Sequence, residues 1–458
     1  MTVAEIASTR SRHVVLLICS TGLLMIGLDA TIVTIALPAI HRSLGSSVAG
    51  LQWTVDAYTL VLASLLMLAG STADRVGRKR VFQLGLLVFS LGSLLCALAP
   101  TQTVLIAARV IQAMGGSMLS PVAMSIIRNV FVDPVERARA IGIYAAMFGL
   151  SIALGPVLGG TLVGLVGWRA VFLVNVPVGA VAILATHRFV PESRAERPRR
   201  VDPVGEVLLI VGLAALTYGV IEGPGRGWAS IEIVASLATA ALAFAFLVPY
   251  ELRRREPLLE VRFFRSAPFS GASAIAVCAF AALGAFLFLN TLYLQDARGL
   301  SALRAGLCLL PMAATVLVFA PISGRLVGSR GPRPALLASG SALMASVALL
   351  TQVDASSSIA YVLVAYAIFG IGFGLVNPPI TNTAVSGMPA SQAGVAAAVA
   401  STSRQVGLTV GVAMAGAIAG ALAWWIILGV VTGVLVLGLV STTPWAEATA
   451  RRTAEAVA

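Results

Sequence analysis

The sequence predicts an all-α polytopic membrane protein with fourteen transmembrane helices. Of its 458 residues, 58% are hydrophobic and only 11% are charged, whereas a soluble domain carries about 25% charged residues. Apolar runs long enough to cross a bilayer recur along the whole chain, and the mean hydropathy is +0.95. A transmembrane barrel is excluded because these runs are continuous and do not alternate at period two.

The spans follow from the length of the apolar runs, since a spanning helix needs about 20 mostly apolar residues. The predicted spans are 14–38, 51–70, 80–99, 102–126, 138–163, 168–190, 204–222, 231–250, 269–294, 303–325, 333–351, 357–380, 394–420 and 422–441. Charge-rich segments at 191–202 and 250–265 bracket two of these helices. The predicted parts are an N-terminal six-helix bundle at 1–192, a linker with two inserted helices at 193–265, a C-terminal six-helix bundle at 266–445 and a tail at 446–458.

The basic residues predict the orientation, because Lys and Arg are retained on the cytoplasmic side of a membrane. If the N-terminus is cytoplasmic, the outer loops hold only Arg42, Arg169, Arg226, Arg298 and Arg304. Both termini, and the tail, are therefore expected in the cytoplasm. The net charge of +12 then belongs to membrane loops, so the lipid bilayer is the expected partner and nucleic acid is not.

The sequence contains no motif that indicates a cofactor or an enzymatic reaction. The four cysteines lie in apolar runs without a CxxC or Cys/His pattern, so neither a disulfide framework nor a metal site is expected. A phosphate-binding loop is excluded because Arg78, not glycine, precedes Lys79. HExxH and GxSxG are also absent. The sequence predicts a protein that is not an enzyme and needs no cofactor.

An internal repeat supports two corresponding halves. Gly70–Lys79 follows the second predicted helix and Gly324–Arg333 follows the tenth, the second helix of the later six. Both segments place two glycines seven residues apart with basic residues after them. Parallel halves around a central site are a transporter architecture.

Five motifs carry a family resemblance. They are LDATIVTIALP at 28–38, GSTADRVGRKR at 70–80, RVIQ at 109–112, GLSIALGPVLGG at 149–160 and WRAVFLVNVPVG at 168–179. With them the chain resembles the major facilitator superfamily, and within it the fourteen-helix drug:proton antiporter family. The resemblance implies a major facilitator fold of two six-helix bundles plus a two-helix insert. Two positions depart from the pattern: Ala113 replaces a glycine, and Gly328 stands where the first loop motif has Asp74.

Ionisable residues inside the spans are few, and each is a functional candidate because burying one in lipid is costly. At 1.5 Å per residue, Asp29, Asp56 and Arg109 lie about 13, 8 and 10 Å from the outer ends of their helices. We expect Asp29 and Asp56 to carry a proton, with Arg109 lowering their proton affinity when it is close. The alternative is a static Asp–Arg cluster that orients the helices.

Two motifs are candidates for conformational gating. Gly155, Pro156, Gly159 and Gly160 permit a kink and a close helix approach, and the resemblance implies that they shape the movement of the halves. Gly70 and Gly77 are expected to permit a tight turn, and Asp74 is expected to pair with Arg75 or Arg78, or with the positive end of a helix. The resemblance implies that this cluster latches the cytoplasmic side closed. Packing and membrane anchoring are the alternatives.

Polar residues in other spans are candidates for lining a substrate cavity. They are Gln112, Asn290, Asn377 and Arg404. Arg404 has no acidic residue nearby in the later helices, so it either bonds backbone carbonyls or a residue across the interface, or meets an anionic substrate group.

These expectations combine into one function with two rivals. The first is proton-coupled antiport that exports a small amphipathic or drug-like compound by alternating access, from the plasma membrane of a bacterium, with one chain sufficient. The second is a dedicated exporter or proton symporter of one endogenous metabolite. The third is a receptor or scaffold that transports nothing.

Overall fold

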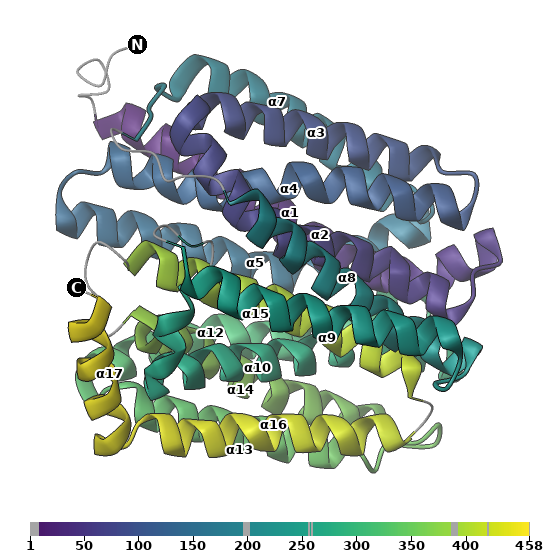
Figure 1. The fold of residues 1–458 in the computed structure, drawn as a ribbon. Coiled ribbons are helices and arrows are strands. Elements are labelled where there is room, and N and C mark those ends of the chain that lie inside the picture. Colours follow the sequence, from purple (N-terminus) through teal and green to yellow (C-terminus); the bar gives the residue numbers. More distant parts are fainter. Residues whose placement is uncertain are drawn as a thin grey trace. The chain divides into compact units, whose positions relative to one another are not determined.

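A computed structural model describes residues 9–195, 202–254, 257, 260–385, 393–418 and 421–457. Within these residues the secondary structure is helical (Figure 1). The chain divides into two compact units. The first comprises Met1–Glu206 with Ser301–Leu307, and the second Val207–Leu300 with Cys308–Ala458. The predicted division at residues 192, 265 and 445 separates groups of spans along the sequence, whereas these units are separated by how the chain packs. The predicted division stays a prediction.

The first unit is a bundle of long helices. Its helices are α1 (Thr9–Leu44), α2 (Val48–Val76), α3 (Arg78–Leu98), α4 (Gln102–Val130), α5 (Pro134–Leu165), α6 (Ala170–Leu173) and α7 (Asn175–Phe189), joined by most of α11 (Ala302–Cys308). The main packing pairs are α3 with α4, α1 with α5, α2 with α4 and α3 with α7. Figure 1 shows α3 and α7 side by side.

Capping residues fix where these helices begin. The hydroxyls of Ser47 and Thr101 accept the amides of Gly50 and Val104 at 3.1 and 3.4 Å, at the starts of α2 and α4. Asp133 accepts two amides at the start of α5, where Pro134 occupies the first turn. Such residues satisfy amides that have no partner within the helix.

Two predicted spans are interrupted. The span at 168–190 breaks at Val174 between α6 and α7, and the span at 303–325 breaks at Leu309 between α11 and α12. A proline follows each break, and proline donates no hydrogen bond to the residue four positions earlier. Pro177 therefore cannot donate to the carbonyl of Leu173, and Pro311 cannot donate to that of Leu307.

The second unit holds the remaining helices. They are α8 (Pro203–Arg226, all but its first residues), α9 (Ile231–Leu252), the short 3₁₀ helix η2 (Val261–Arg265), α10 (Ala267–Leu292), the π-helical turn η3 (Tyr293–Ala297), α12 (Leu310–Arg330), α13 (Pro332–Leu350), α14 (Ile359–Val385), α15 (Ala393–Ala417), α16 (Ala421–Ser441) and α17 (Pro444–Val457). The strongest packing is between α10 and α15 and between α12 and α14. The predicted tail is helical: it forms most of α17, and Thr449 accepts the Ala267 amide at 2.9 Å.

Twelve described helical segments are long and apolar enough to cross a membrane when α6 with α7, α11 with α12 and α10 with η3 are each counted as one, or thirteen if the two arms of α5 form one span. These arms, Val135–Ile152 and Leu154–Leu165, meet at 41°. The other predicted span, 394–420, ends in residues outside the described part of the chain. Its described portion is α15, which is not among the candidates and carries the polar run Ser401–Gln405 at its middle. The chain is a multi-span membrane protein, and the count of fourteen remains a prediction.

Candidate functional site

A buried ion pair lies at the centre of the first unit. Asp29 on α1 and Arg109 on α4 are 0% and 1% exposed, and Arg109 Nη1 donates to Asp29 Oδ2. The two residues were predicted to lie at similar depth, and the structure brings them into direct contact. A buried charge is tolerated where a partner compensates it, and breaking such a pair leaves an uncompensated charge.

Arg109 has further partners. Its Nε donates to the carbonyl of Thr54 at 3.0 Å, and its Nη1 also donates to Gln112 Oε1 at 2.7 Å. The guanidinium carbon lies 4.1 Å from the centre of the Tyr58 ring, a cation–π geometry. These contacts hold the guanidinium in place from α2 as well as α4.

Neutral amides complete the surroundings of Asp29. Gln112 Nε2 donates to Asp29 Oδ1 at 2.7 Å and to Ser93 Oγ at 2.6 Å. Asn175 Nδ2 lies 3.3 Å from the same Asp29 oxygen and 3.2 Å from Ser93 Oγ. Gln112, predicted as a cavity residue, thus belongs to the network that surrounds Asp29. Asn175 and Ser93 were not predicted, and the available signal was the Asn-Val-Pro at the break before α7.

Asp56 is not part of this network. Its carboxylate, on α2, is 0% exposed, and neither oxygen has a hydrogen-bond partner among the described residues. The hydroxyl of Thr59 points to backbone carbonyls of the preceding turn, including that of Asp56 at 3.4 Å. Similar depth along the helices predicted that both carboxylates lie near Arg109. Asp29 contacts Arg109 directly, whereas the Asp56 carboxylate forms no hydrogen bond with it among the described residues.

Close packing of α3 on α4 positions the network. A Cβ on Gly92 would lie 2.5 Å from the Cα of Gln112, and a Cβ on Gly115 would lie 2.2 Å from the amide nitrogen of Phe89. Only glycine allows the two backbones to approach this closely. Ala113, the departure from the family pattern, is 0% exposed and fits within this packing.

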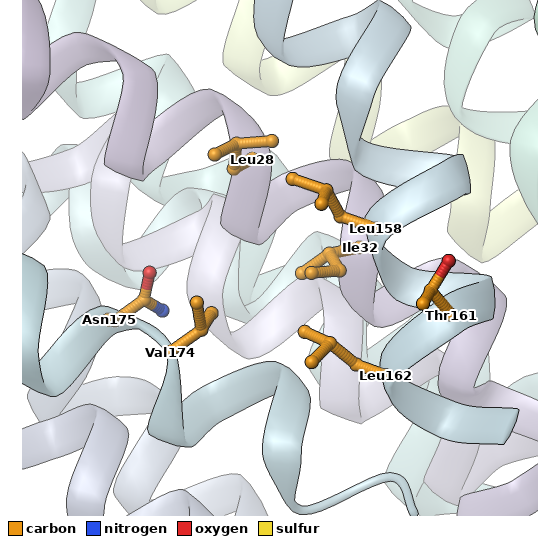
Figure 2. Close-up of a pocket in the computed structure, with 7 residues that line it drawn as sticks. All are labelled: Leu28, Ile32, Leu158, Thr161, Leu162, Val174 and Asn175. Carbon is orange, nitrogen blue, oxygen red and sulfur yellow. The ribbon is translucent and has the colours of Figure 1, made fainter. Parts of the chain in front are cut away.

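A small apolar cavity adjoins the network. Its volume is about 130 Å³, and its walls come from α1, α5 and the break before α7. Figure 2 shows the lining side chains Leu28, Ile32, Leu158, Thr161, Leu162, Val174 and Asn175. Asn175 belongs to both the cavity wall and the Asp29 network. None of the four residues predicted to line a cavity borders this one.

The glycines of α5 pack closely within the first unit. A Cβ on Gly155 would lie 1.9 Å from Thr31 Oγ1, and one on Gly159 would lie 2.9 Å from Ile32 Cγ1, both on α1. A Cβ on Gly160 would lie 2.5 Å from the carbonyl oxygen of Ala302. The 41° bend begins at Ile152, the residue that Pro156 deprives of a hydrogen bond.

The loop between α2 and α3 contains an ion pair. Arg78 donates from Nε and Nη2 to Asp74 Oδ1 at 3.0 and 2.8 Å, while Arg75 is exposed. Gly77, with φ of 126°, makes the turn. Gly70 does not, because it lies inside α2, and its expected role in a tight turn was wrong.

The segment after α7 closes over this loop. Glu192 Oε1 accepts the amide of Lys79 at 3.1 Å, and a Cβ on Gly77 would lie 2.6 Å from the same oxygen. The carboxylate thus sits at the start of α3, where the helix dipole favours negative charge. The sequence had not indicated Glu192 for this position.

In the second unit the predicted cavity residues do not form one cluster. Asn290 is 2% exposed, and its Oδ1 accepts the hydroxyl of Tyr366 at 2.6 Å. Arg404 Nη2 donates to Thr381 Oγ1 at 2.5 Å, and Thr381 in turn donates to the carbonyl of Asn377 at 3.3 Å. Asn377 and Arg404 therefore share one neighbour, and Asn290 makes a separate contact.

Comparisons with known proteins identify the family. Residues 19–412 match the profile of the Major Facilitator Superfamily. The chain is 40% identical over 398 residues to the multidrug resistance protein Stp of Mycobacterium tuberculosis, covering 87% of this chain and 74% of that protein. It is 37% identical over 394 residues to the tetracenomycin C resistance and export protein of Streptomyces glaucescens, covering 86% and 73%.

Solved structures share the fold. A peptide transporter POT in complex with sulfate aligns with a TM-score of 0.70 at 15% identity, covering 96% of this chain and 95% of that one. At this identity the likeness concerns the fold alone. The profile match and the relatives together show that this chain belongs to the Major Facilitator Superfamily.

Proposed function

We propose that this protein exports small amphipathic or drug-like compounds by proton-coupled antiport and alternating access, as a fourteen-helix member of its superfamily. The observation that carries the proposal is the buried pair of Asp29 and Arg109 inside the first unit. The resistance and export named for the relatives support the outward direction and a drug-like substrate. Their bacterial sources support the bacterial cytoplasmic membrane as the location. One chain carries both halves, so a monomer is sufficient.

In the central physical step, a proton replaces Arg109 as the positive charge that neutralises Asp29. While Arg109, Gln112 and Asn175 donate to Asp29, the ionised carboxylate is stabilised and a proton is disfavoured. If a change of conformation withdraws Arg109, the buried charge loses its partner, and binding a proton restores neutrality. Protonation is thereby linked to conformation, as antiport requires.

The other predicted residues take supporting roles in this proposal. Asp56 is a second proton carrier, because its buried carboxylate has no hydrogen-bond partner among the described residues. Gly155, Pro156, Gly159 and Gly160 let α5 bend and pack as the conformation changes. Asp74 and Arg78, closed over by Glu192, act as the cytoplasmic latch.

The test is proton movement in proteoliposomes with an acid interior. Addition of cationic, neutral and anionic amphiphiles to wild type should dissipate the pH gradient for at least one class, and Asp29→Asn should abolish the effect. Glu455→Gln, which neutralises an exposed carboxylate on α17, is the matched control and should behave as wild type.

Other outcomes redirect or refute the proposal. Dissipation that survives in Asp29→Asn but is lost in Asp56→Asn would move the carrier role to Asp56. Dissipation that survives in the double variant would exclude both carboxylates. Transport of a compound without any proton movement would contradict antiport while leaving the family assignment intact.

A further inference from the structure

Arg109 and Arg404, which lie well inside predicted spans, have different surroundings. Arg109 has an acidic partner, a carbonyl and an amide oxygen, as described above. Among the described residues, Arg404 on α15 has two hydrogen-bond partners, both hydroxyls: Thr381 Oγ1 at 2.5 Å from Nη2 and Ser401 Oγ at 3.5 Å from Nη1. Its Nε is buried and has no hydrogen-bond partner among the described residues. A guanidinium offers five N–H donors, so most of its capacity is unused.

Arg404 lies among three helices of the second unit. Gly407, three residues further along α15, packs on α10, where its Cβ would lie 2.4 Å from the carbonyl oxygen of Val277. Residues three apart share a helix face, so Arg404 starts on the α10 side of α15. Its guanidinium carbon lies 6.0 Å from the centre of the Phe280 ring on α10, and its Nη2 reaches Thr381 on α14. Figure 1 shows α10 and α15 running together.

No carboxylate in the surrounding helices balances this charge. The sequences of α10, α14, α15 and α16 contain no Asp, Glu or Lys, and Arg404 is their one arginine. Arg404 is partly exposed, while its Nε is buried; burying part of an unpaired cation is costly unless an anion or several acceptors compensate it. Hydrogen bonds to two hydroxyls and a weakly placed aromatic face offset this cost only in part. The unsatisfied Nε and the lack of a carboxylate in these helices leave the charge of Arg404 open to an anionic partner from elsewhere.

We infer that Arg404 binds the anionic group of the exported compound, and that a planar carboxylate is the preferred form. Guanidinium and carboxylate match as a two-point hydrogen-bonded pair. Thr381 lies next to this position and supplies a neutral polar contact. The inference rests on the proposed export function and adds a substrate class to it: weakly acidic amphiphiles, recognised through their ionised form.

The test compares binding of matched probes to the purified full-length protein in nanodiscs. Three pairs differ only in charge: benzoate and benzamide, indole-3-acetate and indole-3-acetamide, and 1-naphthoate and 1-naphthamide. Wild type should bind at least one carboxylate more tightly than its amide. Arg404→Gln should weaken that carboxylate by about tenfold or more, with the amide changed less than about twofold on the same scale.

Two further variants separate recognition from folding. Arg404→Lys keeps the positive charge and should retain part of the preference for the carboxylate. Arg330→Gln removes an exposed arginine at the end of α12 and should bind both probes as wild type does. Equal weakening of carboxylate and amide in Arg404→Gln would show that Arg404 only holds α14 to α15, and would overturn the inference.

The binding experiment tests the substrate class and the transport experiment tests proton coupling, so either proposal can fail while the other stands. If wild type prefers none of the three carboxylates, the inference is wrong whatever the transport assay shows. If the preference exists and depends on Arg404 while no proton movement accompanies transport, the substrate class stands and the proposed antiport fails.

Discussion

At the scale of single residues, the proposed proton coupling depends on the groups that surround Asp29. Arg109 supplies charge, whereas Gln112 and Asn175 supply neutral donors to the other oxygen. Asn175 differs from Gln112 because it stands at the break before α7 and borders the cavity. The cavity leaves this amide free space on one side, so it can turn away from Asp29 more readily than the enclosed Gln112.

Asn175→Ala should therefore alter the pH dependence of transport. Loss of a donor to the ionised carboxylate makes proton binding easier, so the pH of half-maximal proton-linked transport should move upward by about one unit. Proteoliposome uptake measured between pH 5.5 and 8.5 would show the shift. Thr161→Ala is the matched control, because Thr161 lines the same cavity but donates to the carbonyl of Val157. An unshifted profile in Asn175→Ala would exclude a role for this amide in proton binding.

The sequence predicted the charged members of this site and Gln112, but not Asn175 or Ser93. Asp29 and Arg109 are identifiable because a charge inside a span is costly and rare, so each one demands a partner. Asn175 and Ser93 are uncharged, and polar side chains of that kind occur throughout the spans of this chain without any shared role. Only the packing of α3 and α7 shows that these two meet.

At the scale of elements, the approach of α3 to α4 fixes the position of Gln112. Gly92→Ala should displace it, because the new methyl group would lie 2.5 Å from the Gln112 Cα. Overpacking of this kind costs about 1–3 kcal/mol. The variant should show a lower thermal unfolding temperature and slower transport. Gly142→Ala, with nothing within 4 Å of its Cβ, should be as stable as wild type. Equal stability of both variants would contradict the close-packed interface.

The bend of α5 gives a second prediction at this scale. Gly159→Leu should abolish transport while the protein still reaches the membrane, because the side chain would enter the backbone of α1 at Ile32. Gly164→Leu changes the same helix where nothing lies within 4 Å of the Cβ, and it should transport normally. Membrane fractions probed for protein amount, together with uptake, separate the two effects. Normal transport by Gly159→Leu would rule out the gating role.

Breaks within helices were beyond prediction from hydropathy. The spans at 168–190 and 303–325 read as continuous apolar runs, yet they break before Pro177 and Pro311. Other prolines, such as Pro121 inside α4, leave the helix unbroken. The outcome depends on whether neighbouring groups satisfy the freed carbonyl, and that information lies in tertiary packing.

At the scale of the whole molecule, the internal repeat is visible in the backbone. Gly77 ends α2 with φ of 126°, and Gly331 ends α12 with φ of 78°; their amides donate to Ala73 and Val327. The correspondence was predicted from the spacing of the glycines. The charges differ as expected, since Asp74 pairs with Arg78 and Gly328 has no side chain to pair. The two halves thus share a turn, while the ion pair belongs to the first half.

The number of spans decides on which side of the membrane the segments after α14 lie. If α15 crosses the membrane, three spans separate the loop before α14 from α17, and these sites lie on opposite sides. If α15 enters and returns on one side, both sites lie on the same side. The polar run at Ser401–Gln405 lies in the middle of α15, and hydropathy does not establish that this helix crosses the membrane.

Cysteine labelling resolves this choice. Ala355 and Ala448 are exposed. Ala355 is the labelling position in place of its neighbour Asp354, because hydrogen bonds from Ser356 and Ser357 hold the Asp354 carboxylate and keep its pKa below its usual value. With fourteen spans and a cytoplasmic N-terminus, a membrane-impermeant maleimide should label Ala355→Cys in intact cells and Ala448→Cys only in everted vesicles. The parent protein, whose four cysteines are all in helices, gives the background. Labelling of both sites from the same side would show that α15 does not span, and would place Arg404 in a re-entrant segment.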